Sequence, residues 1–242
     1  MTKGRPILFS APMVRALLAG RKSQTRRTVK PQPGTVAPLP LVPCPLGTDN
    51  WYAGNSRGEA LVFNSEPVRC PYGVPGDRLW VREAAIYWTY GDGRVGGLTP
   101  VVYEGDEDWD GVNRDATLGP PKGLAVDSNH GWWKKRPSIH MPRKFSRITL
   151  LIKSVRVERL HEISEADAIA EGVDPAFRCP NCGYTAEDCG LQMDHRICGE
   201  PHPSIQSYAS LWNSINGPGS WAANPWVWVV GFERIKEGTV TA

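Results

Sequence analysis

Residues 7–27 read ILFSAPMVRALLAGRKSQTRR and hold the clearest succession of structural signals in the chain. The apolar run at residues 7–9 predicts a short strand. Ser10 can then cap a helix, because its hydroxyl can accept a hydrogen bond from an unpaired N–H of the first turn. Gly20 is expected to end that helix, since glycine readily adopts the left-handed conformation of a helix terminus. The predicted apolar face follows the helical period and consists of Met13, Val14, Leu17 and Leu18.

A basic segment follows the predicted helix directly. Residues 20–27 contain two hydroxyl side chains and four cations, which are Arg21, Lys22, Arg26 and Arg27. Clustered like charges repel each other, so the segment indicates a surface that meets an anion, and a solvated basic loop is the alternative. Lys22 and Thr25 converge only if the chain bends after Gly20, because residues three apart in a strand face opposite sides. The arginines would then lower the pKa of Lys22, and a neutral lysine can serve as a base.

Three other stretches carry strand signals. Residues 78–88 follow a turn at Gly76 and Asp77, and their β-branched and aromatic side chains predict a strand. Residues 145–160 alternate in polarity and predict a long, bulged strand. The last predicted strand covers residues 225–235, where Trp226 and Trp228 share a face and are expected to be buried together.

Two later stretches predict helices. Ser164 stands three residues before Asp167 in a pattern that resembles a capping box, and the helix that it opens should stop at Gly172. A second helix should begin near Ser204 and end at Gly217. Its predicted apolar face consists of Tyr208, Leu211, Trp212 and Ile215.

The resulting order of elements is β, α, β, β, α, α, β, which indicates an α+β fold. Segments at about 30–75 and 90–135 are read as long insertions, because they are rich in proline, glycine and polar residues. The 242 residues are 40% hydrophobic, which suits one elaborated domain over residues 1–242.

No stretch approaches the roughly 20 apolar residues of a membrane span, and we expect a soluble cytoplasmic protein. The net charge is only +3, so attraction for nucleic acid would depend on local clusters.

Residues 174–203 form a cysteine-rich insert that is too polar to build its own core. Four thiols lie close together at Cys179, Cys182, Cys189 and Cys198. In a reducing compartment this pattern favours a structural zinc ion with four sulfur ligands. His195 could replace one cysteine, and free or disulfide-paired thiols are the alternative. Cys44 and Cys70 are expected to be lone structural residues.

Some other side chains could line a site. Tryptophans can stack on a nucleobase, although most should lie in the core, and the candidates are Trp80, Trp88, Trp132, Trp133, Trp226 and Trp228. His140 precedes the long predicted strand and could line a barrel mouth, or it could be structural. Glu83 is a candidate for supporting the substrate site, or it pairs with Arg82 or with a cation of the basic segment.

The segment from Ile7 to Arg27 resembles the ASCH superfamily, whose hallmark is a short helix, a Gly-x-Lys turn and a polar segment that ends in a basic residue. Three stretches are similar to a phage and prophage branch and read RLWVRE at 78–83, PSIHMPR at 137–143 and NPWVW at 224–228. The resemblance implies a PUA-like small mixed β-barrel with flanking helices. The long loops and the cysteine insert would interrupt it.

A bacterial ASCH enzyme that hydrolyses N4-acetylcytidine uses a lysine, a threonine three residues later and a glutamate on a downstream helix. Lys22, Thr25 and Glu171 match these positions. The resemblance implies removal of N4-acyl groups from cytidine or cytosine, with Thr25 as nucleophile, Lys22 as its activator and Glu171 as proton shuttle. Arg27 matches a basic residue of the same motif, and the candidate substrate-binding residues of this chain are Arg21, Arg26, Arg27, Glu83 and His140. No organic cofactor is expected.

Two other functions fit the same residues. In a non-catalytic RNA- or DNA-binding module the cations would contact phosphate, and Thr25 would only donate a hydrogen bond. In an endoribonuclease Lys22 would stabilise transition-state charge. The position of Glu171 distinguishes the hydrolase from the binding module, because a carboxylate beside Lys22 is of no use in a phosphate site.

Overall fold

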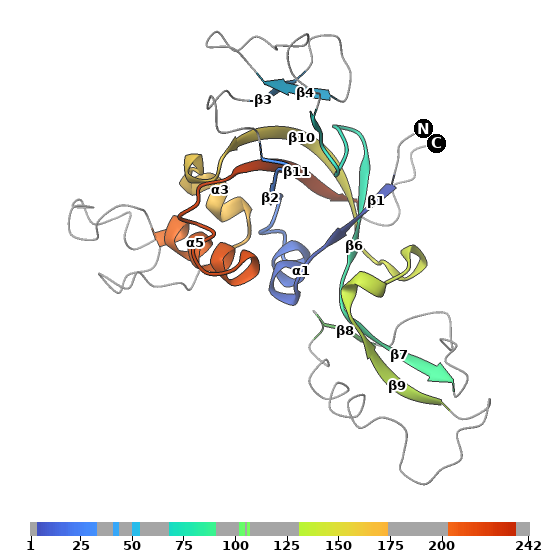
Figure 1. The fold of residues 1–242 in the computed structure, drawn as a ribbon. Helices are drawn as coiled ribbons and strands as arrows, with labels where there is room; N and C mark the ends of the chain where they lie inside the picture. The colour runs from blue at the N-terminus through green and yellow to red at the C-terminus, as the bar shows by residue number, and fades with distance from the viewer. Residues whose placement is uncertain are drawn as a thin grey trace. The chain divides into compact units, whose positions relative to one another are not determined.

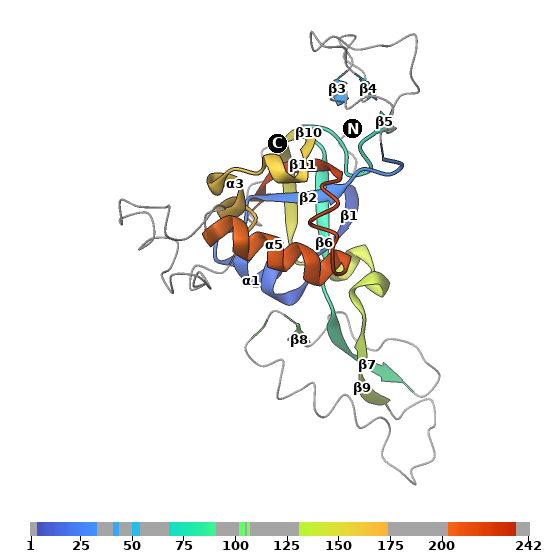
Figure 2. The same ribbon diagram turned by 60° about the vertical axis from the view of Figure 1, so that its left-hand side comes forward.

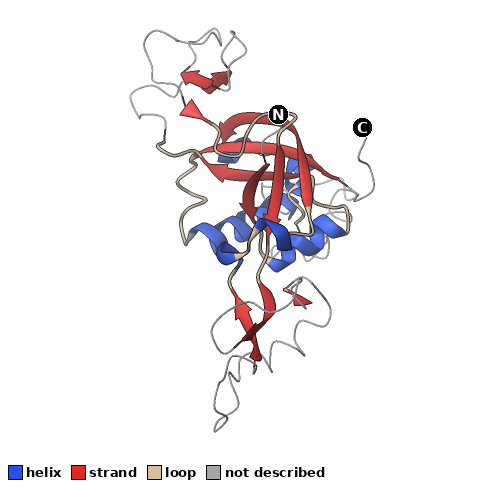
Figure 3. Ribbon diagram, turned by 90° about the vertical axis from the view of Figure 1, so that its right-hand side faces the viewer, coloured by secondary structure: helices blue, strands red, loops and turns tan. Residues whose placement is uncertain are grey.

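A computed structural model describes residues 4–32, 41–43, 50–53, 68–90, 102–104, 106, 131–173 and 203–235. The chain divides into two compact units. Unit 1 comprises Met1–Leu18, Arg78–Leu151 and Arg234–Ala242, and unit 2 comprises Ala19–Asp77 and Ile152–Glu233. Figure 3 colours the few helices and the more numerous strands of this α+β fold. None of the described helices is long and apolar enough to cross a membrane.

The largest sheet is mixed and has the strand order β1-β6-β10-β11-β2 (Figure 1). Strand β1 (Gly4–Leu8) runs parallel to β6 (Arg78–Arg82), and β6 is antiparallel to β10 (Thr149–Arg159). Strand β11 (Trp226–Ile235) is antiparallel to β2 (Gln24–Thr28). The α+β class predicted from the element order is confirmed.

Unit 1 also contains an antiparallel sheet of three strands in the order β8-β7-β9. These strands are β7 (Ala85–Tyr90), β8 (Val102–Tyr103) and β9 (Gly131–Arg136). Two 3-10 turns follow, η1 (Ser138–His140) and η2 (Arg143–Phe145). The hydrophobic core beside this sheet is formed by Ala85, Tyr87, Met141 and Phe145.

Helix α1 (Ala11–Leu18) forms as predicted. The Val14 N–H donates to the Ser10 carbonyl at 2.9 Å, which closes the first turn. Gly20 ends the helix with a φ of 75°. The helix buries Val14 and Leu17. The predicted apolar face is wrong at Leu18, which is 39% exposed.

The prediction of one strand over residues 78–88 is wrong, because β6 ends at Arg82 and β7 begins at Ala85. The two strands belong to different sheets, so the chain has to leave the first ladder at residues 83–84. Glu83 occupies this break, where its N–H donates to the Met141 sulfur at 3.4 Å. Strand β10 starts at Thr149 and not at residue 145, because η2 occupies the predicted beginning.

Unit 2 contains a second antiparallel three-stranded sheet, within the segment predicted to be an irregular insertion. Its strands are β3 (Leu41–Pro43), β4 (Asn50–Ala53) and β5 (Val68–Arg69). Trp51 of β4 packs edge-on against Trp228 of β11, with ring centroids 5.4 Å apart. Trp226 and Trp228 are both buried, as predicted.

Two helices cover one face of β11 in unit 2 (Figure 2). They are α3 (Glu165–Ala170) and α5 (Pro203–Asn216), and a short 3-10 turn, η3 (Leu160–Glu162), precedes α3. Their buried side chains form one hydrophobic core with β11, which contains Leu160, Ile163, Ala168, Tyr208, Trp212, Val227 and Val229. The predicted apolar face of α5 is wrong at Ile215, which is 47% exposed.

Candidate functional site

The last four residues of the basic segment belong to strand β2, which the sequence did not indicate. Its backbone pairs with β11 in a register that places Thr25 opposite Val230, Arg26 opposite Val229 and Arg27 opposite Trp228. Alternate residues of a strand face opposite sides of the sheet. Gln24 and Arg26 therefore share the face of Val227 and Val229, whereas Thr25 and Arg27 share the other face.

Ser23 fixes the position of the chain just before β2. Its N–H donates to the Ala170 carbonyl at 2.9 Å, and its carbonyl accepts from the Phe232 N–H at 2.8 Å. One residue is thus bonded to the end of α3 on one side and to β11 on the other. Lys22, its neighbour, is thereby held beside the C-terminal end of α3.

Helix α3 presents Glu171 to Lys22. The Ser164 hydroxyl accepts from the Asp167 N–H at 3.1 Å and caps the helix, as its sequence pattern predicted. Glu171 lies at the C-terminal cap, and Gly172 ends the helix with a φ of 79°. Ala168 packs into the core of unit 2. The cap at Ser164 and the left-handed Gly172 therefore fix the two ends of α3, and with them the position of Glu171 in the chain.

Lys22 and Glu171 form a buried ion pair between segments 149 positions apart. The Lys22 Nζ atom lies 3.0 Å from Glu171 Oε2, and it also donates to the Glu171 carbonyl at 2.8 Å. The exposed fractions of the two side chains are only 0% and 2%. The structure thus places the glutamate beside the lysine, as the hydrolase hypothesis requires.

Burial lowers the pKa of Lys22 below its ordinary value of 10.5. The charge of Glu171 and its hydrogen bond oppose this effect, and the positive charges of Arg27 and Arg26 add to it. The direction agrees with the sequence prediction, but the main cause is loss of water and not the neighbouring arginines. A lysine with a lowered pKa can supply a neutral amine as a base.

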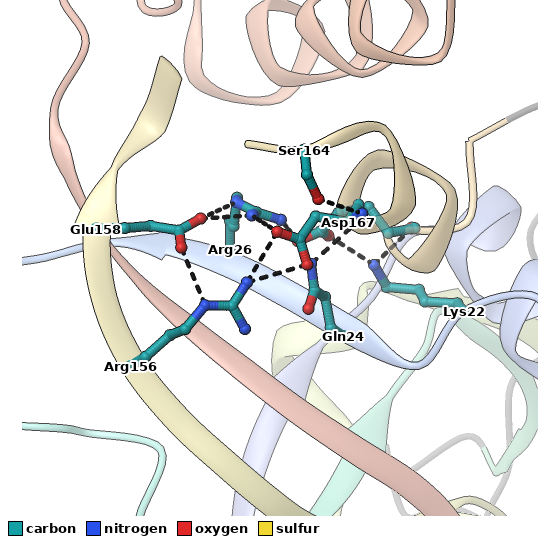
Figure 4. A network of polar contacts seen from close by, with 8 residues as sticks. Lys22, Gln24, Arg26, Arg156, Glu158, Ser164 and Asp167 are labelled. Carbon is teal, nitrogen blue, oxygen red and sulfur yellow. Dashed lines mark hydrogen bonds and ion pairs between the residues drawn. The ribbon is translucent and has the colours of Figure 1, made fainter. Parts of the chain in front are cut away.

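Arg26 lies within a wider network of charged side chains that includes Arg156, Glu158 and Asp167 (Figure 4). Its Nη1 atom lies 3.2 Å from Glu171 Oε1, and its Nη2 atom lies 3.0 Å from Asp167 Oδ2. Its Nε atom donates to Glu158 Oε1 at 3.1 Å. Arg156 binds the same two partners, Glu158 and Asp167, from the side of β10. The guanidinium of Arg26 is therefore surrounded by three carboxylates.

Gln24 completes this network from the same face of β2. Its Nε2 atom donates to Asp167 Oδ1 at 3.0 Å. Burial alone raises the pKa of Asp167, but the hydrogen bond from Gln24 and the charges of Arg26 and Arg156 outweigh it and lower the pKa to about 2. Asp167 therefore contributes stability as a carboxylate.

Replacing Asp167 with asparagine is expected to remove an acid-dependent part of this stability. Because the pKa is about 2 in the folded state and 3.8 ordinarily, the contribution is present above about pH 4 and is lost as the pH falls to 2. Its size is about 2 kcal/mol. Urea unfolding of both proteins between about pH 2 and 6 measures the difference. The exposed Glu165→Gln change on the same helix is the control, and parallel curves for Asp167→Asn and wild type would contradict the expectation.

The network contains as many anions as cations. Three positive side chains, Lys22, Arg26 and Arg156, face three negative ones, Glu158, Asp167 and Glu171. A phosphate group that approached Lys22 or Arg26 would meet these carboxylates as well. The arrangement suits proton transfer within a buried pair better than the neutralisation of a polyanion.

The other residues of the basic segment lie apart from this network. Thr25 is buried on the opposite face of β2 from Gln24 and Arg26. Arg27 shares that face and lies close enough to Tyr72 to oppose the rise that burial causes in the pKa of Tyr72. Arg21 is exposed and donates to the Val173 carbonyl at 3.3 Å, just beyond α3. The four cations therefore do not form one continuous basic patch.

Two predicted substrate-binding residues belong to unit 1. Glu83 is buried and is bound through two hydrogen bonds of 3.0 and 2.9 Å from Arg147, not from Arg82 or the basic segment. Arg147 also binds Asp106 and lies over the Tyr103 ring at 4.0 Å. Burial raises the pKa of Glu83, and the bonds to Arg147 oppose that rise. His140 is exposed at the end of η1.

The predicted zinc ligands Cys179, Cys182, Cys189 and Cys198 lie outside the described residues, as do His195 and Cys44. Cys70 is described and is buried. Within the described ranges, no group of histidine, cysteine or carboxylate side chains could hold a metal ion.

The sequence did not indicate that Gln24, Arg156 and Glu158 belong to this network, and it indicated Asp167 only as part of the helix cap. One signal was available. Lys22, Gln24 and Arg26 recur with a period of two, and so do Arg156 and Glu158, as expected when strands direct polar side chains to one side.

Comparison with protein-family models, curated proteins and solved structures finds no match to this chain.

Proposed function

We propose that this protein is an ASCH-type amidohydrolase with a PUA-like barrel, which removes N4-acyl groups from cytidine or cytosine. The observation that carries the proposal is the buried pair of Lys22 and Glu171, in which burial lowers the pKa of the lysine. Burying charged groups is costly, and charged groups with shifted pKa values are concentrated at functional sites. The resemblance of residues 7–27 to the ASCH superfamily supplies the reaction.

The reaction begins with Lys22 and Thr25. Neutral Lys22 accepts the proton of the Thr25 hydroxyl, and the Thr25 oxygen bonds to the acyl carbon of the substrate. The Lys22 amine is bonded to Glu171, which also binds Arg26, whereas Thr25 faces the opposite side of β2, so this transfer requires the Lys22 side chain to turn toward Thr25. The bond from the acyl carbon to N4 then breaks as this nitrogen receives the proton, which leaves an acyl ester on Thr25.

Water completes the reaction by hydrolysing the ester. Glu171 accepts a proton from the water molecule, the acid is released, and the Thr25 oxygen recovers its proton. The hydrogen bond between Lys22 Nζ and Glu171 Oε2 provides a direct path for a proton between Lys22, the base in acylation, and Glu171, the base in ester hydrolysis. Arg27 or a backbone N–H stabilises the oxyanion.

A binding module that used the same cations for phosphate is less well supported. Lys22 and Arg26 are buried, and each is bound to a carboxylate. Phosphate contacts would need to displace these carboxylates at the cost of leaving them unpaired. The endoribonuclease hypothesis meets the same obstacle, because Lys22 is neutralised by Glu171.

The acyl-threonine intermediate gives a direct test. The purified wild type is expected to release cytidine from N4-acetylcytidine, and rapid acid quenching should trap one acetyl group on Thr25, located by peptide mass spectrometry. Thr25→Ser should keep turnover within about 10-fold, since it retains a hydroxyl nucleophile, whereas Thr25→Ala should lose the adduct. Absence of turnover by the wild type with acetyl, propionyl and benzoyl substrates would overturn the proposal.

A further inference from the structure

A second group of cations lies on one face of strand β6 in unit 1. Arg78, Trp80 and Arg82 alternate along this strand and share a face. The register places Thr149 of β10 opposite Trp80. We call this surface, together with Arg143 of η2, the Trp80 face.

Two guanidinium groups are ordered by the tryptophan. The Cζ atoms of Arg82 and Arg143 lie 4.7 and 5.9 Å from the Trp80 ring centroid. Arg82 also donates to the Ile139 carbonyl at 3.1 Å, and Arg143 donates to Thr149 Oγ1 at 3.1 Å. All of these partners are uncharged. The contacts therefore orient the guanidinium groups and leave their positive charge unneutralised.

The Trp80 face differs in this respect from the network around Arg26. Among the described residues, no carboxylate forms an ion pair with Arg78, Arg82 or Arg143. Arg78 and Arg143 are exposed, as is the adjacent Lys144, and residues 131–144 contain no acidic side chain. Positive charge at this surface is thus accessible and in excess.

We propose that the Trp80 face binds the phosphate backbone of a polynucleotide. The Cα atoms of Arg78 and Arg82 are about 13 Å apart along the strand, because each residue advances it by about 3.3 Å. The Arg82 guanidinium is held over Trp80, which lies between these two residues, and Arg143 and Lys144 add two more cations, so the surface carries more positive charge than one phosphate group neutralises, and successive phosphates of one strand match it. Arginines that are already oriented lose little freedom when they bind.

This proposal does not rest on the hydrolase function. The residues of the Trp80 face all belong to unit 1, and Lys22, Thr25 and Glu171 belong to unit 2. Polynucleotide binding therefore persists in a Lys22→Met variant. The two proposals can fail independently, because the hydrolase is tested by turnover of N4-acetylcytidine and the Trp80 face by its affinity for a polynucleotide.

The test is binding of dye-labelled oligothymidylate, followed by fluorescence anisotropy over a series of salt concentrations. The double variant Arg78→Gln/Arg143→Gln is expected to bind at least about 10-fold more weakly than wild type at about 0.1 M salt. Loss of two phosphate contacts should also reduce the slope of log K against log salt by about 1.4.

The matched control removes two exposed cations from other places, as Arg15→Gln/Lys153→Gln. It has the same net charge as the test variant, and it is expected to bind as wild type does. Equal weakening in both double variants would show unspecific attraction and overturn the proposal. So would absence of binding by the wild type, or preferential binding to vesicles rich in phosphatidylserine that excess oligothymidylate does not displace.

Discussion

Replacing Lys22 with methionine is expected to lower the turnover of N4-acetylcytidine by about 100-fold to 10,000-fold, the usual range for removal of a general base. Methionine fills much of the same buried volume, and Glu171 keeps its contact with Arg26 Nη1 at 3.2 Å. The variant should therefore stay folded, with a free energy of unfolding close to that of wild type, while its turnover falls. Initial rates from chromatography, together with urea unfolding of the same samples, measure both.

The pH dependence of the wild type offers a separate check on Lys22. The rate of the chemical step should rise with pH as Lys22 loses its proton. This rise should lie below the ordinary lysine pKa of 10.5, because burial disfavours the charged form. Measuring kcat over a series of pH values shows where this rise occurs. A rate that stays flat up to that value would contradict the assignment of Lys22 as the base.

The chain provides a matched control for this substitution. Lys153 and Glu233 form a pair of the same chemical type, with Nζ and Oε1 2.8 Å apart, but both side chains are more than half exposed. Lys153→Met therefore removes a lysine and breaks an ion pair without entering the buried network. It should leave kcat unchanged. Equal losses of turnover in Lys153→Met and Lys22→Met would point to a general effect on the protein.

The second large effect is expected for Arg26→Met, which should destabilise the protein by about 3 to 5 kcal/mol. The Arg26 side chain is 0% exposed and contacts Glu158, Asp167 and Glu171. Its removal leaves Glu171 with Lys22 alone and takes away a buried charge that Glu158 and Asp167 share. The free energy of unfolding from urea titration near neutral pH measures the loss.

Arg156→Met is the matched control for Arg26. Arg156 binds Glu158 and Asp167 as Arg26 does, but its side chain is 40% exposed, and water can replace much of the contact. The expected loss is about 1 kcal/mol or less. If the two variants lost equal stability, burial would not be what makes the Arg26 contacts strong.

The helices of unit 2 could be predicted because their signals are local. Ser164 and Gly172 mark the two ends of α3, and Gly217 follows the last residue of α5. Capping and left-handed termination depend on a few neighbouring residues, so the sequence carries them directly. Strand β11 was also predictable, since its apolar residues are continuous.

Strand β2 could not be predicted in this way. Its residues, Gln24–Thr28, contain no apolar side chain, and its pairing with β11 joins positions about two hundred residues apart. What stabilises it is the burial of Arg26 against three carboxylates from β10 and α3, and no local pattern reveals such a partner. The contact of Lys22 with Glu171 was reached only through the resemblance to a known superfamily.

The bonds of Ser23 constrain how this sequence can change in length. Both backbone groups of Ser23 are engaged, one by Ala170 and one by Phe232, so the spacing from Lys22 to Gln24 is fixed from two sides. Inserting or deleting one residue here would turn Gln24 and Arg26 to the opposite face and separate them from Asp167. Substitution of the Ser23 side chain should be tolerated far better than any change in the number of residues.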